Sequence, residues 1–327
     1  MSIKFVKLTD ELKYSVYECY NKNVGNFYKQ ISYEDFSKNF YEHIEFDQNG
    51  VFVAVLVDEV IGFIACHIRG IEKEDSNKPC YISTFMVDEK YRRIGVGRKL
   101  LECAEEFAKN NNKNKLCVGY VGTLNWPWYI PNTDKHDHNG APGACVNSDL
   151  YFFLLNNGFN IIDEEDAFHL DLSKFKMPQR VLNDLENLSK NNIVIELYDP
   201  KKHYGLEEFY EEIQSEPFER VIRYNLSLEN PNPFAVVSEG GKVAGWTGAF
   251  YTEPSGRAHF DGIIVAPHVR GNGLGRALFA TLAKYSFENG SSFMTFFTGR
   301  TNFARYIYLS LGFRIIQSFA VMEKEIK

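Results

Sequence analysis

One stretch decides the fold of this chain: Arg270-Gly271-Asn272-Gly273-Leu274-Gly275. The apolar run at 258–265 predicts a β-strand before it, and the apolar spacing over 274–285 predicts an amphipathic helix after it. A strand-to-helix turn leaves several backbone N–H groups unpaired, and the helix dipole adds positive charge at that point. Glycine allows positive φ there and lets a phosphate approach the backbone closely. The stretch therefore predicts a cradle for a pyrophosphate.

Two other phosphate-binding loops do not fit these residues. A Rossmann fingerprint requires Gly-x-Gly-x-x-Gly early in a series of βαβ units, whereas here the order is Arg-x-x-Gly-x-Gly and it lies late in the chain. A Walker loop requires Gly-Lys followed by Ser or Thr, which this stretch lacks. Arg270 and Arg276 flank the turn and are expected to add charge-assisted contacts to the ligand.

The same plan occurs once more, earlier in the chain. A predicted strand at 81–87 leads to Arg92-Arg93-Ile94-Gly95-Val96-Gly97, and a helical pattern follows. Each copy later reaches a helix that ends in Gly-Phe, at Gly158-Phe159 and at Gly312-Phe313. A repeat of this length predicts two copies of a domain rather than a solenoid of short units.

Both glycine turns resemble the acyl-CoA pyrophosphate loop of the GNAT N-acetyltransferase family. The resemblance implies an α/β (α+β) fold of two tandem GNAT domains, each with a mixed, mostly antiparallel central sheet flanked by helices. We expect an N-terminal domain at 1–172, a linker at 173–192 and a C-terminal domain at 193–327. A Pro-Gly loop in the first copy also weakly resembles tandem members similar to mycothiol synthase.

The resemblance implies acetyl-CoA, or CoA, as the cofactor and acetyl transfer to an amine as the reaction. In the C-terminal copy, the residues expected to bind the cofactor are Ile263, Val265, Arg270, Gly271, Asn272, Gly273, Leu274, Gly275 and Arg276. In the N-terminal copy, the corresponding residues are Val87, Arg92, Arg93, Gly95, Val96, Gly97 and Arg98.

Acetyl transfer requires a base that deprotonates the amine and an acid that protonates the departing thiolate. The family commonly places a tyrosine acid four residues before the glycine of Gly-Phe, and Tyr308 stands there. It commonly places a carboxylate base four residues before the last valine of the fourth strand, where Asp261 stands. His259 is expected on the same strand face as Asp261. The family's usual asparagine, seven residues before the tyrosine, is replaced by Thr301, with Asn302 beside it.

The first copy lacks both proton-transfer groups, since Leu154 and Ser83 stand at the two positions. We therefore expect the N-terminal copy to be non-catalytic and to complete the acceptor pocket of the catalytic C-terminal copy. The leading prediction is an N-acetyltransferase that acts on the amine of a small molecule. Two alternatives remain open, a protein or peptide amine acetyltransferase and a non-catalytic acyl-CoA-binding sensor.

The first copy carries an insert that the second copy lacks. It contains Trp126-Pro127-Trp128-Tyr129-Ile130-Pro131 and then Asp134-Lys135-His136-Asp137-His138. The aromatic run is expected to pack between the domains or to form one wall of an acceptor pocket. The histidines and aspartates lack a further ligand at a recognisable spacing, so no metal site is expected.

Composition agrees with these expectations. The 327 residues suffice for two domains, and the net charge of −7 argues against a nucleic-acid partner. Six cysteines without a Cys-x-x-Cys pair indicate free thiols in a cytoplasmic protein. The chain has no apolar run long enough to cross a membrane, so we expect no membrane partner. A monomer or homodimer is expected.

Overall fold

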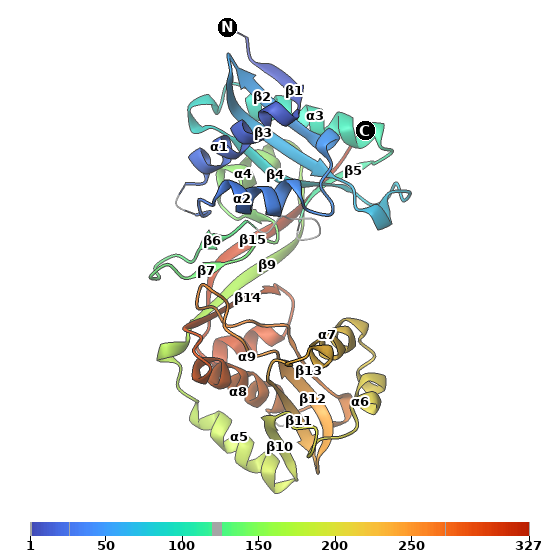
Figure 1. Ribbon diagram of the computed structural model, residues 1–327, viewed down its shortest axis with the longest axis vertical. Helices are drawn as coiled ribbons and strands as arrows, with labels where there is room; N and C mark the ends of the chain where they lie inside the picture. The colour runs from blue at the N-terminus through green and yellow to red at the C-terminus, as the bar shows by residue number, and fades with distance from the viewer. Residues whose placement is uncertain (1, 26, 120–125, 272, 327) are drawn as a thin grey trace. The chain divides into compact units, whose positions relative to one another are not determined.

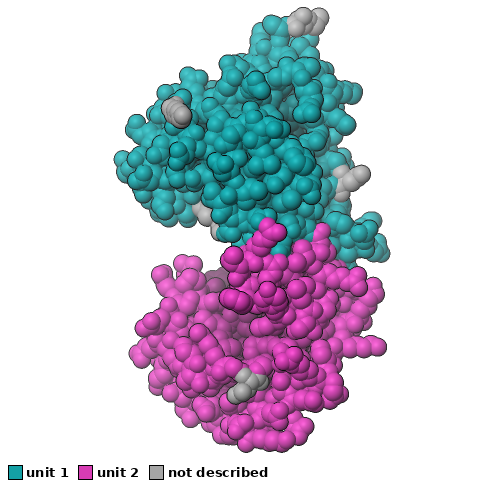
Figure 2. All heavy atoms as spheres, turned by 180° about the vertical axis from the view of Figure 1, so that it is seen from behind, with its two compact units in different colours: residues 1–166, 317–327 teal, residues 167–316 magenta. Residues whose placement is uncertain are grey.

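The computed structural model describes residues 2–25, 27–119, 126–271 and 273–326. The chain divides into two compact units, which Figure 2 distinguishes by colour. Unit 1 comprises Met1–Asp166 together with Gln317–Lys327, and unit 2 comprises Ala167–Ile316. Each unit is described by itself below.

Unit 1 is built around a mostly antiparallel sheet. Its helices are α1 (Lys13–Asn23), α2 (Tyr33–Phe36), α3 (Val96–Asn110) and α4 (Asp149–Asn156). The strands that begin in it are β1 (Lys4–Lys7), β2 (Val51–Leu56), β3 (Glu59–His67), β4 (Cys80–Val87), β5 (Lys115–Val118), β6 (Trp128–Tyr129), β7 (Asp137–His138), β8 (Ala144–Cys145) and β9 (Asn160–Asp171). Strands β1 to β4 pair antiparallel in chain order, and β4 pairs with β5 in parallel.

The two faces of this sheet carry separate helices (Figure 1). Helix α3 buries Leu100, Ala104 and Phe107 at helical spacing against one face. Helices α1 and α2 pack on the other face through a second apolar cluster that includes Val16 and Phe36. Strand β3 is buried along nearly all its length, because both of its faces are covered in this way.

Unit 2 repeats this plan around a shorter sheet. Its helices are α5 (Gln179–Lys190), α6 (Leu206–Ile213), α7 (Glu216–Ser227), α8 (Leu274–Glu288) and α9 (Ala304–Ser310). The strands that begin in it are β10 (Ile193–Leu197), β11 (Phe234–Glu239), β12 (Lys242–Gly248), β13 (Ile263–Val265), β14 (Phe293–Gly299) and β15 (Arg314–Glu325). Strands β10 to β13 form an antiparallel sheet in chain order, with β13 at its edge.

The two units exchange the ends of their last strands. Strand β15 begins in unit 2, but its residues from Gln317 onward belong to unit 1, where Met322 pairs with Val118 of β5. Strand β9 begins in unit 1, but its end from Ala167 onward belongs to unit 2. There the Phe168 carbonyl accepts a hydrogen bond from Thr295 Oγ1 of β14 at 2.7 Å.

This division differs from the boundaries expected from the sequence. The last eleven residues, 317–327, lie in unit 1 rather than in a domain at 193–327. The segment 173–192, expected to be a linker, contains helix α5, which packs on α8 and β10 inside unit 2 (Figure 1). Helix α5 forms because Val181, Leu185 and Leu188 recur at helical spacing and join the unit 2 core.

Among residues 2–25, 27–119, 126–271 and 273–326, no helix combines the length and apolar character needed to cross a bilayer.

Candidate active site

The glycine turn of the second copy connects β13 to α8. Gly271 has φ +105° and Gly273 has φ +77°, the left-handed region that glycine enters without a steric cost. Gly273 is the N-cap of α8, and no side chain of a described residue caps that helix end. A Cβ added at Gly271 would meet nothing within 4 Å, so a ligand can approach the backbone there. Asn272 lies outside the described residues.

The first copy has the same turn with the same dihedral pattern. Arg93 and Gly95 have φ +65° and +95°, and Gly95 is the N-cap of α3. In both turns an arginine folds back onto the strand before it. Arg92 Nε donates to the Val87 carbonyl at 3.0 Å, and Arg270 Nε donates to the Val265 carbonyl, also at 3.0 Å. The sequence repeat is therefore a structural repeat, in which the two valines are equivalent.

The charged side chains around the turns differ between the copies. Arg276 of α8 is paired with Asp184 of α5, whose Oδ2 lies 2.5 Å from the guanidinium. The same carboxylate approaches the backbone of Gly273, where an added Cβ would lie 2.4 Å from Asp184 Oδ2. In the first copy, a Cβ added at Gly95 would meet nothing within 4 Å. Only the second cradle thus has a carboxylate against its N-cap glycine.

In each copy, the strand before the turn separates from the next parallel strand. In unit 1, β4 pairs with β5 at Cys80 and Tyr81, near its start, and then continues to Val87. In unit 2, the Ala258 N–H donates to the Phe293 carbonyl at 2.8 Å, and β13 then forms the edge of its own sheet. An edge strand offers backbone N–H and C=O groups to an extended ligand. Ile263 and Val265 lie on that edge.

The segment before β13 is not the continuous strand that the sequence predicts. The strand expected at 258–265 is correct only over 263–265, because Gly262 has φ +128° and interrupts it. A Cβ at Gly262 would lie 2.6 Å from the ring of Phe218 in α7. The backbone therefore needs glycine where it passes this ring. His259 and Asp261 nevertheless meet, with His259 Nε2 and Asp261 Oδ1 2.7 Å apart.

His259 lies at the centre of a charged network. Its Nδ1 is 3.3 Å from Oε1 of Glu253, which is also paired with Arg257. The Tyr251 ring stacks on the imidazole with centroids 4.1 Å apart. Burial lowers the pKa of His259, but the hydrogen bonds to Asp261 and Glu253 outweigh it and raise that pKa to about 9. The imidazole is therefore protonated at neutral pH and donates to both carboxylates.

Asp261 is held from a second side as well. Its Oδ2 accepts a hydrogen bond from the Ala249 N–H at 3.3 Å, while its own N–H donates to the Gly248 carbonyl at 3.1 Å. Asp261 and His259 open on a pocket of about 650 Å³. Its lining residues are Arg220, Val221, Tyr224, Asn225, Leu228, Asn232, Ala249, Tyr251, His259 and Asp261. All ten belong to unit 2, so the described part of this pocket needs no residue of the first copy.

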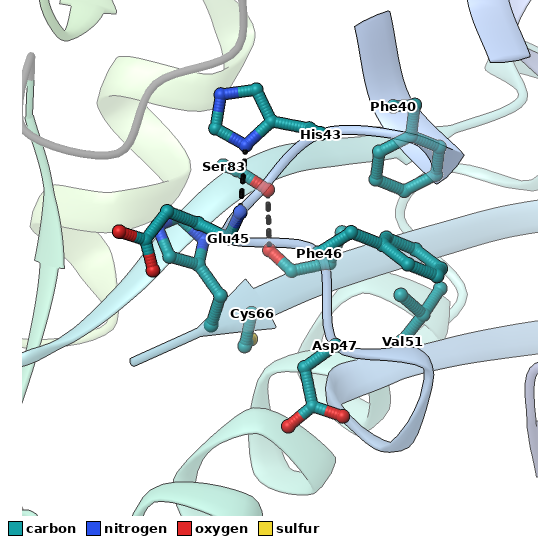
Figure 3. A pocket seen from close by; sticks show the side chains of 10 residues that line it. Phe40, His43, Glu45, Phe46, Asp47, Val51, Cys66 and Ser83 are labelled. Carbon is teal, nitrogen blue, oxygen red and sulfur yellow. Dashed lines mark hydrogen bonds between the residues drawn. The ribbon is translucent and has the colours of Figure 1, made fainter. Parts of the chain in front are cut away.

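The position of unit 1 that is equivalent to Asp261 lines a much smaller cavity, whose side chains Figure 3 shows. Ser83 stands four residues before Val87, as Asp261 stands four residues before Val265, and Ser83 lines a cavity of about 10 Å³. Its hydroxyl donates to the Ala65 carbonyl at 3.3 Å. The other lining residues are Phe40, His43, Glu45, Phe46, Asp47, Val51, Ala65, Cys66 and His67. A cavity of this size holds about one water molecule.

Tyr308 lies in the unit 2 core rather than in the wall of the Asp261 pocket. It is 6% exposed, and its ring centroid lies 4.6 Å from those of Phe279 and Phe296. Phe260, the neighbour of Asp261, packs on the same two rings. Burial raises the pKa of Tyr308, although a hydrogen bond with the Thr298 side chain opposes this, so the phenol stays protonated at neutral pH.

A profile of the Acetyltransferase (GNAT) family matches residues 14–126 and, separately, residues 197–313. This chain belongs to the GNAT family. The two matches make it a tandem GNAT protein, as the repeated glycine turns predicted. An Archaeoglobus fulgidus protein named as an uncharacterized N-acetyltransferase is 32% identical over 101 residues, which are 30% of this chain and 68% of that protein.

Solved structures show the same fold at low sequence identity. A tandem GNAT protein from the clavulanic acid biosynthesis pathway matches all of this chain and 99% of its own length, with 16% identity and a TM-score of 0.59. A GNAT protein from Sphaerobacter thermophilus matches 99% of this chain and 96% of its own length, with 14% identity and a TM-score of 0.61. A fungal glucosamine N-acetyltransferase region gives a TM-score of 0.67 at 14% identity and covers 98% of this chain, but the chain spans only 38% of that fungal protein.

The aromatic insert of the first GNAT copy lies in the core of unit 1. Trp126 Nε1 donates to Thr84 Oγ1 of β4 at 2.9 Å, and its ring stacks on Phe36. Trp128 is fully buried, and its Nε1 donates to the Gly140 carbonyl at 2.7 Å. From the sequence, these rings were expected to pack between the domains or to form a wall of an acceptor pocket. The contacts of Trp126 and Trp128 given above match neither expectation. The Trp126 ring instead packs on Tyr20, Phe36 and Phe40 of the same unit.

The histidines and aspartates of the insert have structural partners. Asp137 Oδ2 lies 2.7 Å from Lys29 Nζ, and the His138 ring stacks on Trp128. Among the described residues, no three His, Cys, Asp or Glu side chains are grouped so as to hold a metal ion.

Several residues of the GNAT site escaped sequence reasoning. Glu253, Arg257 and Tyr251 surround His259, but they come from the loop after β12, which has no regular period to reveal its geometry. Asp184 was hidden because its segment is charged and amide-rich and was interpreted as a linker. A signal was available for α5, since its apolar residues already showed helical spacing.

Proposed function

We propose that this GNAT protein transfers an acetyl group from acetyl-CoA to the primary amine of a small molecule, with the chemistry in the C-terminal copy. One observation carries the proposal. Equivalent positions in the two copies open on pockets of very different size, about 650 Å³ beside Asp261 and about 10 Å³ beside Ser83. A pocket of several hundred Å³ is in the range that binds small molecules.

The polar groups of the two pockets favour the same copy. The Asp261 carboxylate is partly exposed and lies beside a protonated imidazole. The Ser83 hydroxyl is bonded to the Ala65 carbonyl and is a poor proton acceptor. His67, the buried imidazole of the small pocket, has its pKa lowered to about 4 by burial and is neutral. The cavity beside Ser83 therefore lacks the space that an acceptor molecule requires.

Asp261 would accept the proton that the acceptor amine must lose before it attacks. The Ala249 N–H and the His259 imidazolium hold the carboxylate in position. The amine proton passes to Asp261 directly or through one water molecule, and the edge of β13 offers backbone N–H groups for the oxyanion that develops. Tyr308, kept protonated by burial, would supply the proton to the leaving sulfur.

Acetyl-CoA fits the turn, because Gly271 leaves the backbone accessible and no described side chain caps α8. The first-turn N–H groups of α8 and the exposed Arg270 side chain would hold its pyrophosphate. When bound, this group supplies the thioester carbonyl that the amine attacks. Arg276 is already paired with Asp184. We therefore assign phosphate binding mainly to the backbone N–H groups of the turn rather than to Arg276.

The test is acetyl-CoA-dependent thiol release with pooled amines. The pools contain polyamines, amino acids, amino sugars and short lysine peptides; amino sugars are included because the fungal region described above is named for glucosamine. Asp261→Asn and Tyr308→Phe are compared with Ser83→Ala, the matched change in the first copy. We expect turnover with one small-amine pool, lost or slowed by the first two changes and unaffected by the third.

Three outcomes would overturn the proposal. Turnover that resists Asp261→Asn and Tyr308→Phe but fails in Ser83→Ala would assign the chemistry to the first copy. Turnover confined to the lysine peptides would favour a peptide acetyltransferase. Acetyl-CoA binding without turnover in any pool would favour the sensor.

A further inference from the structure

We infer that the acceptor carries an oxyanion, a carboxylate or a phosphate, in addition to its amine, and that Arg220 binds this oxyanion. The inference rests on the proposed function and narrows its acceptor to a zwitterionic amine. One face of α7 carries the argument, because Arg220, Val221, Tyr224 and Asn225 line the pocket at the spacing of one helix side.

The two arginines of α7, Arg220 and Arg223, have different surroundings. Arg223 is engaged by Glu207 at 2.5 Å and Glu219 at 2.8 Å, and it lies over the Tyr210 ring. It does not line the pocket. Arg220 is exposed and lines the pocket, and among the described residues its guanidinium has no hydrogen-bond or ion-pair partner. The fold thus satisfies one guanidinium and leaves the other available to a ligand.

The pocket presents one carboxylate, Asp261, and two cations, Arg220 and the His259 imidazolium, of which His259 is already paired with Asp261. Asp261 attracts the acceptor ammonium, and Arg220 presents a planar set of N–H donors that matches a carboxylate or phosphate. Arg220 and Asp261 form no ion pair with each other in the described structure, where Asp261 is paired with His259. An acceptor with an amine at one end and an oxyanion at the other satisfies both.

The remaining walls suit a body between these two ends. Tyr224 and Tyr251 are 68% and 39% exposed, and Val221, Leu228 and Ala249 add apolar surface. Asn225 is not free to select the ligand, because it exchanges hydrogen bonds with the backbone of Asn232 at 2.9 and 3.1 Å. Aromatic and apolar walls favour a ring or hydrocarbon body, with specificity left to the charged ends.

The experiment compares matched amines with and without the oxyanion. Phenylalanine and phenethylamine form the carboxylate pair, and glucosamine 6-phosphate and glucosamine form the phosphate pair. Each is assayed by thiol release with the wild type, Arg220→Gln, Arg220→Lys and Arg223→Gln, and circular dichroism confirms that each variant is folded. Arg223→Gln is the matched control, since it removes a cation from the same helix but outside the pocket lining.

We expect one anionic member to exceed its neutral partner in kcat/KM. Arg220→Gln lowers that kcat/KM by about 10- to 100-fold, mainly through KM, because a hydrogen-bonded charge is lost. In Arg220→Gln, turnover of the neutral amine changes less than about twofold. This is well below the effect of losing one charged hydrogen bond. Arg220→Lys restores part of the loss and Arg223→Gln does not reproduce it. The pair that responds identifies the oxyanion as carboxylate or phosphate.

The failures are distinguishable. If amines are acetylated with no preference for the anionic member, and Arg220→Gln behaves as the wild type, the oxyanion inference is wrong while the proposed function stands. If neither the wild type nor any variant acetylates an amine from the two pairs or the wider pools, both the oxyanion inference and the proposed function are wrong. If Arg220→Gln slows neutral and anionic amines equally, Arg220 has a structural role and the inference is overturned.

Discussion

The charged network around His259 gives a prediction that needs no knowledge of the acceptor. In Asp261→Asn, we expect the pKa of His259 to fall from about 9 toward its ordinary value of 6.5. The imidazole loses the carboxylate at 2.7 Å, which raises its pKa more strongly than Glu253 at 3.3 Å does. The asparagine oxygen can still accept a hydrogen bond, so the variant removes charge and little else.

The magnitude follows from the same contacts. A pKa of about 9 in place of 6.5 corresponds to a net preference for the imidazolium of about 3 to 4 kcal/mol before solvent screening, at about 1.4 kcal/mol per tenfold change. Asp261 supplies the larger part, so the pKa of His259 in Asp261→Asn should fall by more than the fall in Glu253→Gln. Because burial opposes protonation, removal of both carboxylates should take the pKa below 6.5.

The direct assay is an NMR titration of the histidine ring resonances, with His259→Gln used to assign the signal. Stability provides a second measurement. A folded pKa raised above the unfolded one stabilises the protein fully below about pH 6.5, and this contribution is lost as the pH rises through about 9. The wild type should therefore lose more free energy of unfolding than Asp261→Asn between those values. An unchanged His259 titration in Asp261→Asn would refute the network as described.

Three further predictions concern the cradle, the acid and the first copy. Tyr308→Phe should lower kcat by about 10²- to 10⁴-fold and change the free energy of unfolding by only about 1 kcal/mol; equal kcat would exclude it as the acid. Gly273→Ala should lower stability by about 1–3 kcal/mol and weaken CoA binding in calorimetry, because its Cβ would meet Asp184. Gly290 has a φ similar to that of Gly273 but open space around it, so Gly290→Ala should destabilise the protein without weakening CoA binding. Equal CoA affinities for Gly273→Ala and the wild type would contradict the cradle. Trp126→Ala should cost about 3–5 kcal/mol in urea unfolding and leave the rate per folded molecule unchanged; a lost rate in the folded variant would assign the first copy a catalytic role.

Much of the fold could be predicted from local signals. The strand predicted at 81–87 and the helix predicted over 274–285 are present as β4 and α8. The strand before the second turn was predicted too long, because an apolar run cannot reveal where Gly262 takes φ +128°. Local pattern reports burial and period, whereas a glycine interruption depends on what packs against it, here Phe218.

The candidate site was predictable in part for the same reason. Asp261 and His259 are two residues apart, so a local argument brought them together, and they are in contact. The two pockets could not be compared from the sequence, because each lining combines residues far apart in the chain, such as Phe40 with Ser83 in unit 1 and Arg220 with Asp261 in unit 2. The Asp184 partner of Arg276 lies 92 residues away and was likewise invisible.

The sequence by itself determined that this is a tandem GNAT protein, because the glycine turns and Gly-Phe helix ends are local motifs whose chemistry depends on neighbouring residues. Only the tertiary structure decided where each last strand belongs. The backbone N–H and C=O groups of a strand can form the same hydrogen bonds with any sheet edge of matching register. Long-range packing therefore decides which sheet the strand joins. That packing assigns β15 from Gln317 to Glu325 to the unit 1 sheet and Ala167–Asp171 to unit 2.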